Sequence, residues 1–384
     1  MEPKMINVFQ PSLGDDELAA VGEVFKTSWI GRGTKVAEFE EAWAAHLGVG
    51  RSHVTSTNSC TEATFLAMEL FGIGPGDEVV LPTVNFVGAA NAVAAHGARP
   101  VFCDVDPELL NPTVEDIERC LTPKTRGVLL LHYGGRPGHI VEIAKLCQER
   151  GIWLMEDAAN AQSSSVDGKA VGTFGDISAW SFDWGKIAVA LDGGILYAKD
   201  PAVTAEAAKR AYLGMAQSSG FSEAHRTQTR WWEFEVSSFS RRSIMNDVQA
   251  AVGTTQLAKL RDFVKRRRLI AEFYDSAIAE VPGLRTPPPL PDGHESSYYI
   301  YWVQMDPAIR DAVARQLFDE GIYTTFRYQL LHKVDAYGSD AVLPSAEKAA
   351  ASTLCLPIHQ ALSDSDIGRV VDTLARAVRD RTHG

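Results

Sequence analysis

Lys186 is the residue in this sequence best suited to covalent chemistry. It follows the segment Asp183-Trp184-Gly185 and precedes the apolar run Ile187–Leu191. A free ammonium is costly to bury among apolar neighbours, so we expect burial to lower the pKa of this lysine. An amine with a lowered pKa is suited to forming an imine with a carbonyl compound. A lysine that extends from a loop to water is the alternative interpretation.

Asp157 is the second residue that suggests chemistry. The apolar run Ile152-Trp153-Leu154-Met155 has the character of a buried strand, and Glu156-Asp157-Ala158-Ala159-Asn160 follows it. This pattern sets a carboxylate at a strand end among small residues. In sheets with crossover helices, ligands bind outside the carboxyl ends of the strands. The alternative is an aspartate that only caps the start of a helix.

Two further segments with polar or aromatic residues also lie at the ends of predicted strands. Thr57-Asn58-Ser59-Cys60-Thr61 opens a predicted helix and leaves backbone N–H groups free to hold an anion, so it is a candidate phosphate site. Pro82-Thr83-Val84-Asn85-Phe86 places an aromatic ring after another strand, where the ring could lie against a planar ligand. Ordinary helix capping and a core phenylalanine are the alternatives for these two segments.

Together, these four segments supply the protein groups that pyridoxal phosphate needs. The lysine forms the Schiff base, the carboxylate keeps the pyridine nitrogen protonated, and the helix start holds the phosphate. The sequence contains no Gly-x-Ser-x-Gly segment and no Gly-Lys-Ser/Thr segment, which disfavours serine hydrolases and nucleotide hydrolases. The glycines of Gly72-Ile73-Gly74-Pro75-Gly76 precede a strand, so they indicate a turn and not a dinucleotide site.

Strands and helices alternate from residue 50 to residue 200, and they must position these groups. The predicted strands are His53–Thr57, Glu78–Pro82, Pro100–Asp104, Gly127–His132, Ile152–Asp157, Ser178–Phe182 and Gly194–Ala198. The predicted helices are Thr61–Phe71, Phe86–His96, Val114–Leu121 and Ile140–Arg150. This alternation predicts an α/β fold with a large, mostly parallel seven-stranded sheet and helices on both faces.

A smaller α/β domain is expected toward the C-terminus. A helical pattern runs from about Met245 to Ala279, and the proline-rich stretch 282–293 indicates a linker. The elements predicted after the linker are the strands Tyr298–Gln304 and Ile322–Phe326 and the helices Pro307–Glu320 and Ser363–Val378. We therefore expect a large cofactor-binding domain at residues 1–250, with an N-terminal substrate segment at 1–35. The connecting helix and the small domain would occupy residues 251–384.

Composition limits the class of protein. The chain has 384 residues, of which 45% are hydrophobic and 22% charged, as in ordinary globular proteins. A net charge of −12 disfavours a nucleic-acid partner, and no apolar run is long enough to span a membrane. No secretory signal is visible at the amino terminus, so a cytoplasmic location is expected. Five scattered cysteines without zinc-binding spacing predict reduced thiols and no metal.

The order of these features resembles that of fold-type-I aminotransferases, and more closely that of the DegT/DnrJ family of sugar aminotransferases. The resemblance extends from Trp29-Ile30-Gly31-Arg32-Gly33 to Leu356-Pro357-Ile358-His359. Its most specific part is Glu156–Ala161, followed by Val171–Asp176 and by Ser181-Phe182 with Lys186 five residues after the serine. The resemblance implies the fold of type I pyridoxal phosphate-dependent transferases and a homodimer whose active sites contain residues of both subunits.

The resemblance also implies roles for individual residues. Lys186 would form the Schiff base, and Asp157 would contact the pyridine nitrogen. The remaining cofactor contacts would be Ser59, Cys60, Thr61 and Ser181 at the phosphate, Phe86 on the ring, Asn160 at the hydroxyl and Arg242 from the neighbouring subunit. The expected substrate contacts are Trp29, Arg32, Arg241, Arg327 and Tyr328. Asn160 stands where the family commonly has Gln, and Asp183-Trp184-Gly185 replaces the usual His-Pro or Tyr-Pro before the lysine.

The expected activity is transfer of an amino group from glutamate to a nucleotide-linked keto sugar. A dTDP-linked 4-keto-6-deoxyhexose is the preferred acceptor, as in deoxyaminosugar and antibiotic biosynthesis. A 3-keto sugar or a cyclitol ketone such as an inosose is the alternative acceptor. A regulatory or binding protein on the same scaffold and a nicotinamide-dependent oxidoreductase are the alternatives from other classes. The pair Lys186 and Asp157 favours the transaminase, because a binding protein needs no imine-forming amine opposite an acid.

Overall fold

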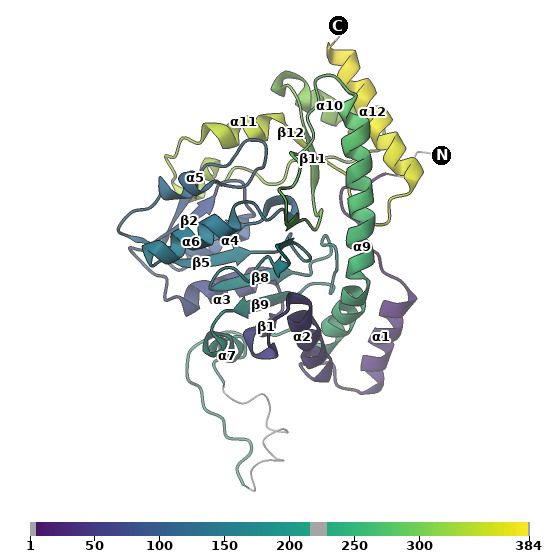
Figure 1. Cartoon of the computed structure of the whole chain (residues 1–384). Helices are drawn as coiled ribbons and strands as arrows, with labels where there is room; N and C mark the ends of the chain where they lie inside the picture. The colour runs from purple at the N-terminus through teal and green to yellow at the C-terminus, as the bar shows by residue number, and fades with distance from the viewer. Residues whose placement is uncertain (1–4, 216–228, 383–384) are drawn as a thin grey trace.

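A seven-stranded sheet forms the centre of the molecule (Figure 1). The computed structural model describes residues 5–215 and 229–382, so the first four residues of the predicted segment 1–35 lie outside it. The strand order is β1-β9-β8-β5-β4-β2-β3. These strands are β1 (Val54–Thr57), β2 (Glu78–Pro82), β3 (Arg99–Cys103), β4 (Thr125–Leu131), β5 (Trp153–Asp157), β8 (Ile177–Ser181) and β9 (Gly194–Ala198). The pairs from β8 to β3 are parallel, whereas β9 is antiparallel to both β8 and β1. The predicted fold class is confirmed.

Helices cover both faces of this sheet. They include α2 (Thr34–Leu47), α3 (Cys60–Leu70), α4 (Val87–Ala95), α5 (Val114–Glu118), α6 (Ile140–Arg150) and α7 (Pro201–Arg210). Helix α1 (Asp15–Lys26) packs instead against the long helix α9 (Asp247–Ala279). Successive strand residues face opposite sides. Val79 and Leu81 of β2 share a hydrophobic cluster with α3 and α4, whereas Val80 shares another with α5 and α6. Burial on both faces explains why the inner strands are continuous apolar runs.

Helix α9 (Asp247–Ala279) runs beside the sheet and continues past it (Figure 1). Its start is fixed by a capping box, in which Asn246 Oδ1 accepts from the Gln249 N–H at 3.0 Å and Gln249 Oε1 accepts from the Asn246 N–H at 3.2 Å. Gly253 is required for close packing, because a Cβ there would lie 2.9 Å from the Phe39 ring of α2. The predicted helix from about Met245 to Ala279 is confirmed to within two residues.

The C-terminal part has its own hydrophobic cluster, to which α9 also contributes Ile270, Tyr274 and Ile278. Its main elements are β11 (Tyr301–Gln304), α10 (Pro307–Asp319), α11 (Pro344–Ser352), β12 (Thr353–Leu356) and α12 (Asp364–Thr382). The smaller elements, which are spread along the described chain, are η1 (Arg51–His53), η2 (Tyr133–Gly135), β6 (Ser165–Val166), β7 (Lys169–Ala170), β10 (His294–Glu295), η3 (Leu331–Lys333) and η4 (Asp335–Tyr337). The division into domains at residue 250 stays a prediction.

The predicted strand Ile322–Phe326 is wrong. Ile322 and Thr325 form only single bridges, to Ile6 and Cys355. The strand that pairs with β11 is β12, which sequence patterns did not reveal. It follows α11 without any turn residue, so the helical pattern before it conceals where the strand begins.

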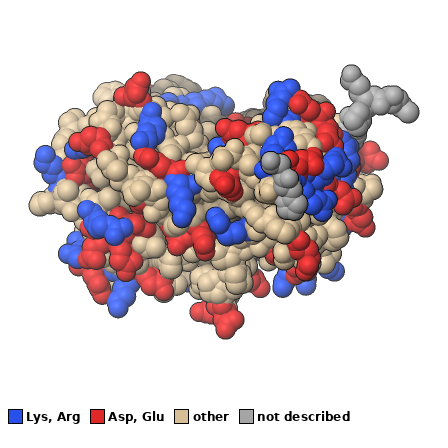
Figure 2. Space-filling model, turned by 90° about the horizontal axis from the view of Figure 1, so that it is seen from above, with Lys and Arg blue, Asp and Glu red and all other residues tan. Residues whose placement is uncertain are grey.

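The surface carries both signs of charge. Figure 2 shows Lys and Arg intermixed with Asp and Glu on the face seen from above. Within residues 5–215 and 229–382, no helix is long and apolar enough to cross a membrane. The cytoplasmic location stays a prediction.

Candidate active site

A cavity of about 200 Å³ lies at the carboxyl ends of β5 and β8, beside the start of α3. It collects nine of the residues that the sequence singled out. These are Ser59, Cys60, Thr61, Phe86, Asp157, Ser181, Lys186, Arg327 and Tyr328. A larger hollow of about 1050 Å³ lies between α9 and the proline-rich stretch, but none of the predicted site residues lines it. The smaller cavity is therefore the candidate active site.

The start of α3 forms one wall of the cavity. The Ser59 hydroxyl accepts from the Glu62 N–H at 3.1 Å, so this side chain caps the helix. The first N–H groups of a helix have no partner within it, and those of Cys60 and Thr61 are free to bind an anion in this way. Gly194 of β9 packs against this turn, where a Cβ would lie 2.6 Å from the Cys60 nitrogen. Only glycine allows the strand to approach the helix start so closely.

Lys186 and Asp157 lie in the same cavity, and both are buried. The Lys186 ammonium donates to Asn160 Oδ1 at 3.2 Å and lies 4.6 Å from the centre of the Tyr299 ring. Asp157 Oδ1 accepts from the Ala159 N–H at 3.1 Å. The Asn160 Nδ2 group is buried and has no hydrogen-bond partner among the described residues. A donor is therefore available for a ligand oxygen beside the lysine.

The environment shifts the pKa of both groups. Burial lowers the pKa of Lys186, but Tyr299, Tyr328 and the Asp157 carboxylate outweigh it, and the net shift is upward. The expectation that burial brings this lysine toward neutrality is therefore wrong for the protein chain by itself. Burial raises the pKa of Asp157, although the Ala159 N–H and the Lys186 ammonium oppose the shift.

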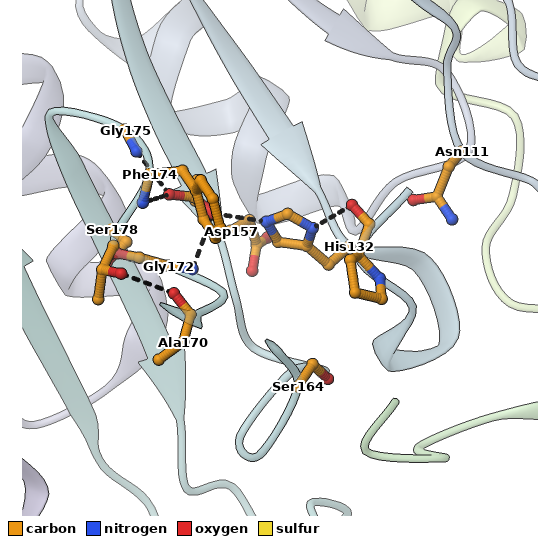
Figure 3. A network of polar contacts seen from close by, with 12 residues as sticks. Asn111, His132, Asp157, Ser164, Ala170, Gly172, Phe174, Gly175 and Ser178 are labelled. Carbon is orange, nitrogen blue, oxygen red and sulfur yellow. Dashed lines mark hydrogen bonds and ion pairs between the residues drawn. The ribbon is translucent and has the colours of Figure 1, made fainter. Parts of the chain in front are cut away.

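A buried polar network lies behind Asp157. Figure 3 shows His132, Gly172, Phe174 and Gly175 grouped beside it. The Glu156 carboxylate accepts from the N–H groups of these last three residues at 2.6 to 2.7 Å, and it contacts His132 Nε2 at 3.0 Å. Because Glu156 directly precedes Asp157, this network fixes the end of β5. The polar residue His132 after the apolar run of β4 was a signal that the sequence reasoning did not use.

Glutamine side chains hold the loop that carries Lys186. Gln162 Nε2 donates to the Ser181 and Ala188 carbonyls at 2.9 Å, and Gln162 Oε1 accepts from the Ala188 N–H at 2.9 Å. Further contacts come from Gln360 to the Ile187 carbonyl, from the Val189 N–H to Gln256 and from Gln249 to the Asp192 carbonyl. No sequence pattern indicates these four glutamines, because they contact the loop from distant parts of the chain.

Aromatic and basic side chains form the mouth of the cavity. Phe86 is 46% exposed, and its ring lies edge-on to Tyr328 with centroids 6.0 Å apart. The Arg327 guanidinium lies 4.5 Å from the centre of the Phe9 ring. The side chain of Arg327 has no acidic partner within 4 Å among the described residues. It is thus a cation available to an anionic ligand.

Five predicted residues do not line this cavity. One of them, Asn160, contacts the Lys186 ammonium at its edge, and the other four lie apart from it. Arg32 pairs with Glu40 at 2.8 Å, and the Trp29 indole donates to the Arg32 carbonyl at 3.1 Å. Arg241 pairs with the α3 residues Glu62 and Glu69, and the Arg242 guanidinium lies 5.6 Å from the centre of the Tyr212 ring. Their roles in binding stay predictions.

Comparison with known proteins identifies the family. The sequence profile of the DegT/DnrJ/EryC1/StrS aminotransferase family matches residues 11–375. The chain belongs to this family. The predicted aminotransferase is confirmed over the oxidoreductase and the non-catalytic binding protein.

Individual proteins of known name align over nearly the whole chain. The sequence is 52% identical over 374 residues to a dTDP-4-dehydro-2,3,6-trideoxy-D-glucose 4-aminotransferase of Saccharopolyspora spinosa, covering 97% of both chains. The crystal structure of the aminotransferase TlmJ from Streptoalloteichus hindustanus is similar, with 58% identity, a TM-score of 0.95 and coverage of 98% of this chain and 100% of that one. A Streptococcus pneumoniae protein assigned as a sugar aminotransferase, solved in its PLP form, shares the fold at 21% identity and a TM-score of 0.89, with 98% and 99% coverage.

Replacing Gln162 tests the support of the lysine loop. Gln162→Leu leaves three buried main-chain groups without partners, at about 1–3 kcal/mol each. We expect the free energy of unfolding to fall by about 3 kcal/mol or more, measured by denaturant unfolding without cofactor. The matched variant Gln249→Leu, which removes more exposed contacts, should cost about 1 kcal/mol. Equal losses in the two variants would contradict the assignment.

Proposed function

We propose that this aminotransferase moves an amino group from glutamate to a dTDP-linked 4-keto-6-deoxyhexose, with pyridoxal phosphate as its cofactor. The observation that carries the proposal is that Lys186, Asp157 and the start of α3 meet in one cavity. The acceptor is supported by the relative named for a 4-aminotransferase of a dTDP-linked trideoxy sugar. A 3-keto sugar and a cyclitol ketone are outcomes that the experiments below distinguish.

The residues around the cavity fit pyridoxal phosphate. The α3 N–H groups of Cys60 and Thr61, together with Ser181, would hold its phosphate. Asp157 would hold the ring nitrogen, and the unpartnered Asn160 Nδ2 would donate to the ring hydroxyl. Phe86 would lie on the ring face. When bound, this cofactor carries the amino group and withdraws electrons from the carbon that loses a proton.

Lys186 Nζ would move the proton in this reaction. Its burial excludes water, so the proton passes between the amine and the substrate and does not escape to solvent. The Asp157 carboxylate, held by the Ala159 N–H, would keep a proton on the nitrogen opposite to it. The glutamines that hold the loop of residues 181–192 would maintain the position of the amine between successive half-reactions.

Arg327 would bind the negative charge of the substrates. Glutamate and a nucleotide-linked sugar are both anionic, whereas Asp157, Asp183 and Asp192 make the cavity wall acidic. Besides Lys186, Arg327 is the cation among the residues that line the cavity. It would therefore bind the carboxylate of the donor, leaving Lys186 free to transfer the proton.

The choice of acceptor is tested with the purified enzyme, glutamate and a panel of keto sugars. We expect amination of the dTDP-linked 4-keto-6-deoxyhexose, with NMR locating the new C–N bond at carbon 4. Amination at carbon 3, or turnover only with an inosose, would replace the proposed acceptor by one of the alternatives.

Lys186→Ala tests the choice of lysine. This variant should lose turnover and the covalent attachment of pyridoxal phosphate. Borohydride reduction and then mass spectrometry detect the attachment. The exposed Lys199, replaced in the same way, is the control and should behave like the wild type. Attachment that persists in Lys186→Ala would mean that another amine reacts.

Arg327→Leu tests the proposed substrate cation. Loss of a hydrogen-bonded charge pair should raise the KM for glutamate about tenfold to a hundredfold. Arg327→Lys should restore part of the affinity, and Arg261→Leu on the exposed face of α9 should have no effect. An unchanged KM in Arg327→Leu would exclude this role.

We also infer that the enzyme is a homodimer with shared active sites. The described residues from 229 to 239 extend away from the body of the molecule (Figure 1) and carry exposed aromatic side chains. Trp232, Phe234 and Phe239 are 62%, 65% and 104% exposed. Exposed apolar groups in this number are typical of a surface that another chain covers. Arg242 follows this segment and would reach the cavity of the second copy, since it does not line its own.

Mixing two inactive variants tests the shared sites. Lys186→Ala and Arg242→Ala dimers should each have little activity, whereas a hybrid dimer has one site with both native residues. An equal mixture after subunit exchange should recover about a quarter of the wild-type activity. Sedimentation gives the oligomeric state, and a monomer, or a mixture without recovery, would contradict shared sites.

A further inference from the structure

Lys186 and Arg327 lie at opposite ends of a column of two aromatic rings. The Arg327 guanidinium lies 4.5 Å from the centre of the Phe9 ring. The rings of Phe9 and Tyr299 are stacked, with centroids 5.1 Å apart and an interplanar angle of 18°. The Lys186 ammonium lies 4.6 Å from the centre of the Tyr299 ring. Two cations of the candidate site are thus linked by two rings that do not line the cavity.

Distant parts of the chain build this column. Phe9 and Tyr299 are 6% and 1% exposed. The segment before Phe9 is fixed by the bridge between Ile6 and Ile322, with hydrogen bonds of 2.9 Å from the Ile6 N–H to Gly321 and from the Tyr323 N–H to Ile6. The rings are therefore held by the main chain and not only by their own contacts.

The turn before Tyr299 is strained. Tyr298 has a φ of +51°, a conformation that a tyrosine adopts only where its surroundings impose it. The buried Arg267 guanidinium donates to the carbonyls of Tyr298 and Tyr299 at 3.1 and 3.3 Å, and to that of Ile358 at 2.7 Å. The Tyr299 N–H donates to the Gly134 carbonyl at 3.0 Å. These contacts fix the direction of the Tyr299 ring.

The chemistry of Lys186 indicates what the stacked rings of Phe9 and Tyr299 contribute. The amine must be free in part of the reaction, and a free ammonium in a buried cavity needs partners. Its direct partners are the Asn160 carbonyl oxygen and the face of Tyr299, and both are neutral. A ring face attracts a cation by its quadrupole, but it offers no site that takes the proton. Such a partner stabilises the ammonium and still allows the proton to pass to a substrate.

We propose that Phe9 and Tyr299 are positioning residues for amino transfer, whose stacked rings hold the Lys186 ammonium at one end and the Arg327 guanidinium at the other. This inference rests on the proposed roles of Lys186 and Arg327. Tyr299 acts on the state in which the lysine amine is free, and Phe9 acts on the orientation of the cation that meets the donor carboxylate. The two ends therefore have separate readouts.

The Lys186 end is tested by the rate at which added pyridoxal phosphate attaches to the full chain after removal of bound cofactor. In this step the Nζ lone pair attacks the aldehyde carbon and one water leaves, so only the unprotonated amine reacts. The groups that face Lys186 are Asp157 from β5, Cys60 from α3, Tyr299, and Tyr328 beside Arg327, while Asp183 and Asp192 line the same cavity. These groups are unchanged in the variants below, apart from Tyr299 itself.

Tyr299→Met removes the ring face and retains a large apolar side chain, whereas Tyr299→Phe retains the ring and removes the hydroxyl. Loss of the face makes the ammonium less favourable, so the pH at which attachment becomes half-maximal should fall by about half to one unit in Tyr299→Met. Tyr299→Phe should keep the wild-type profile. A wild-type profile in a folded Tyr299→Met variant, or equal shifts in both variants, would overturn the proposal.

The Arg327 end is tested by Phe9→Met. We expect the KM for glutamate to rise about threefold to tenfold while kcat changes less than twofold, because a cation–π contact to the guanidinium is lost. An unchanged KM for glutamate, whether or not kcat falls, would overturn the proposed role of Phe9. Thermal unfolding of each variant shows whether it is folded, and Phe9→Met carries the test if Tyr299→Met does not fold.

The experiments distinguish an error in the proposed role of the two rings from an error in the proposed function. If Lys186→Ala loses cofactor attachment and Arg327→Leu raises the KM, the proposed site stands. Wild-type behaviour of the ring variants in that case overturns the column only. If Lys186→Ala still attaches the cofactor, the proposed site itself fails.

Discussion

A primary amine that must react is buried in this protein, and the rest of the structure is arranged around that constraint. Water is excluded from Lys186, yet its direct contacts are an amide oxygen and a ring face and not a carboxylate. The direct partners support the charge without a close carboxylate, although Tyr299, Tyr328 and the Asp157 carboxylate in the same cavity raise the pKa of the amine. This arrangement depends on the position of the surrounding main chain, which buried side chains from several elements hold in place.

Those supports explain why so many polar groups are buried around the seven-stranded sheet. Glu156 satisfies three N–H groups of the loop 172–175 and contacts His132, and Gln162 satisfies three groups of the lysine loop. Each is fully partnered, as buried polar groups must be to stabilise a fold. The first network holds the end of β5 that carries Asp157, and the second holds the loop after β8 that carries Lys186.

Much of this could be predicted from the sequence, because the signals are local. The apolar runs indicate the strands, and the residues directly after them indicate the edge of the sheet where Asp157, Lys186 and the start of α3 meet. The strand at residues 322–326 failed because its β-branched residues lie in a loop that makes single bridges only. The contacts of Phe9, Gln162 and Gln256 join residues far apart in the chain, so no local pattern announces them. The direction of the Lys186 pKa shift depends on the sum of several neighbours, and burial alone predicts it wrongly.

Arg267 shows how firmly the C-terminal part is tied to the long helix. Its guanidinium lies within the protein, burial lowers its pKa to about 9, and its main-chain acceptors come from the turn at 298–299 and from residue 358. If C-terminal segments were exchanged between related enzymes, the buried Arg267 guanidinium would lose its hydrogen-bond acceptors unless α9, the turn at 298–299 and residue 358 were exchanged together. The contacts of this one side chain therefore join α9 to the C-terminal part, wherever the junction between exchanged segments is placed.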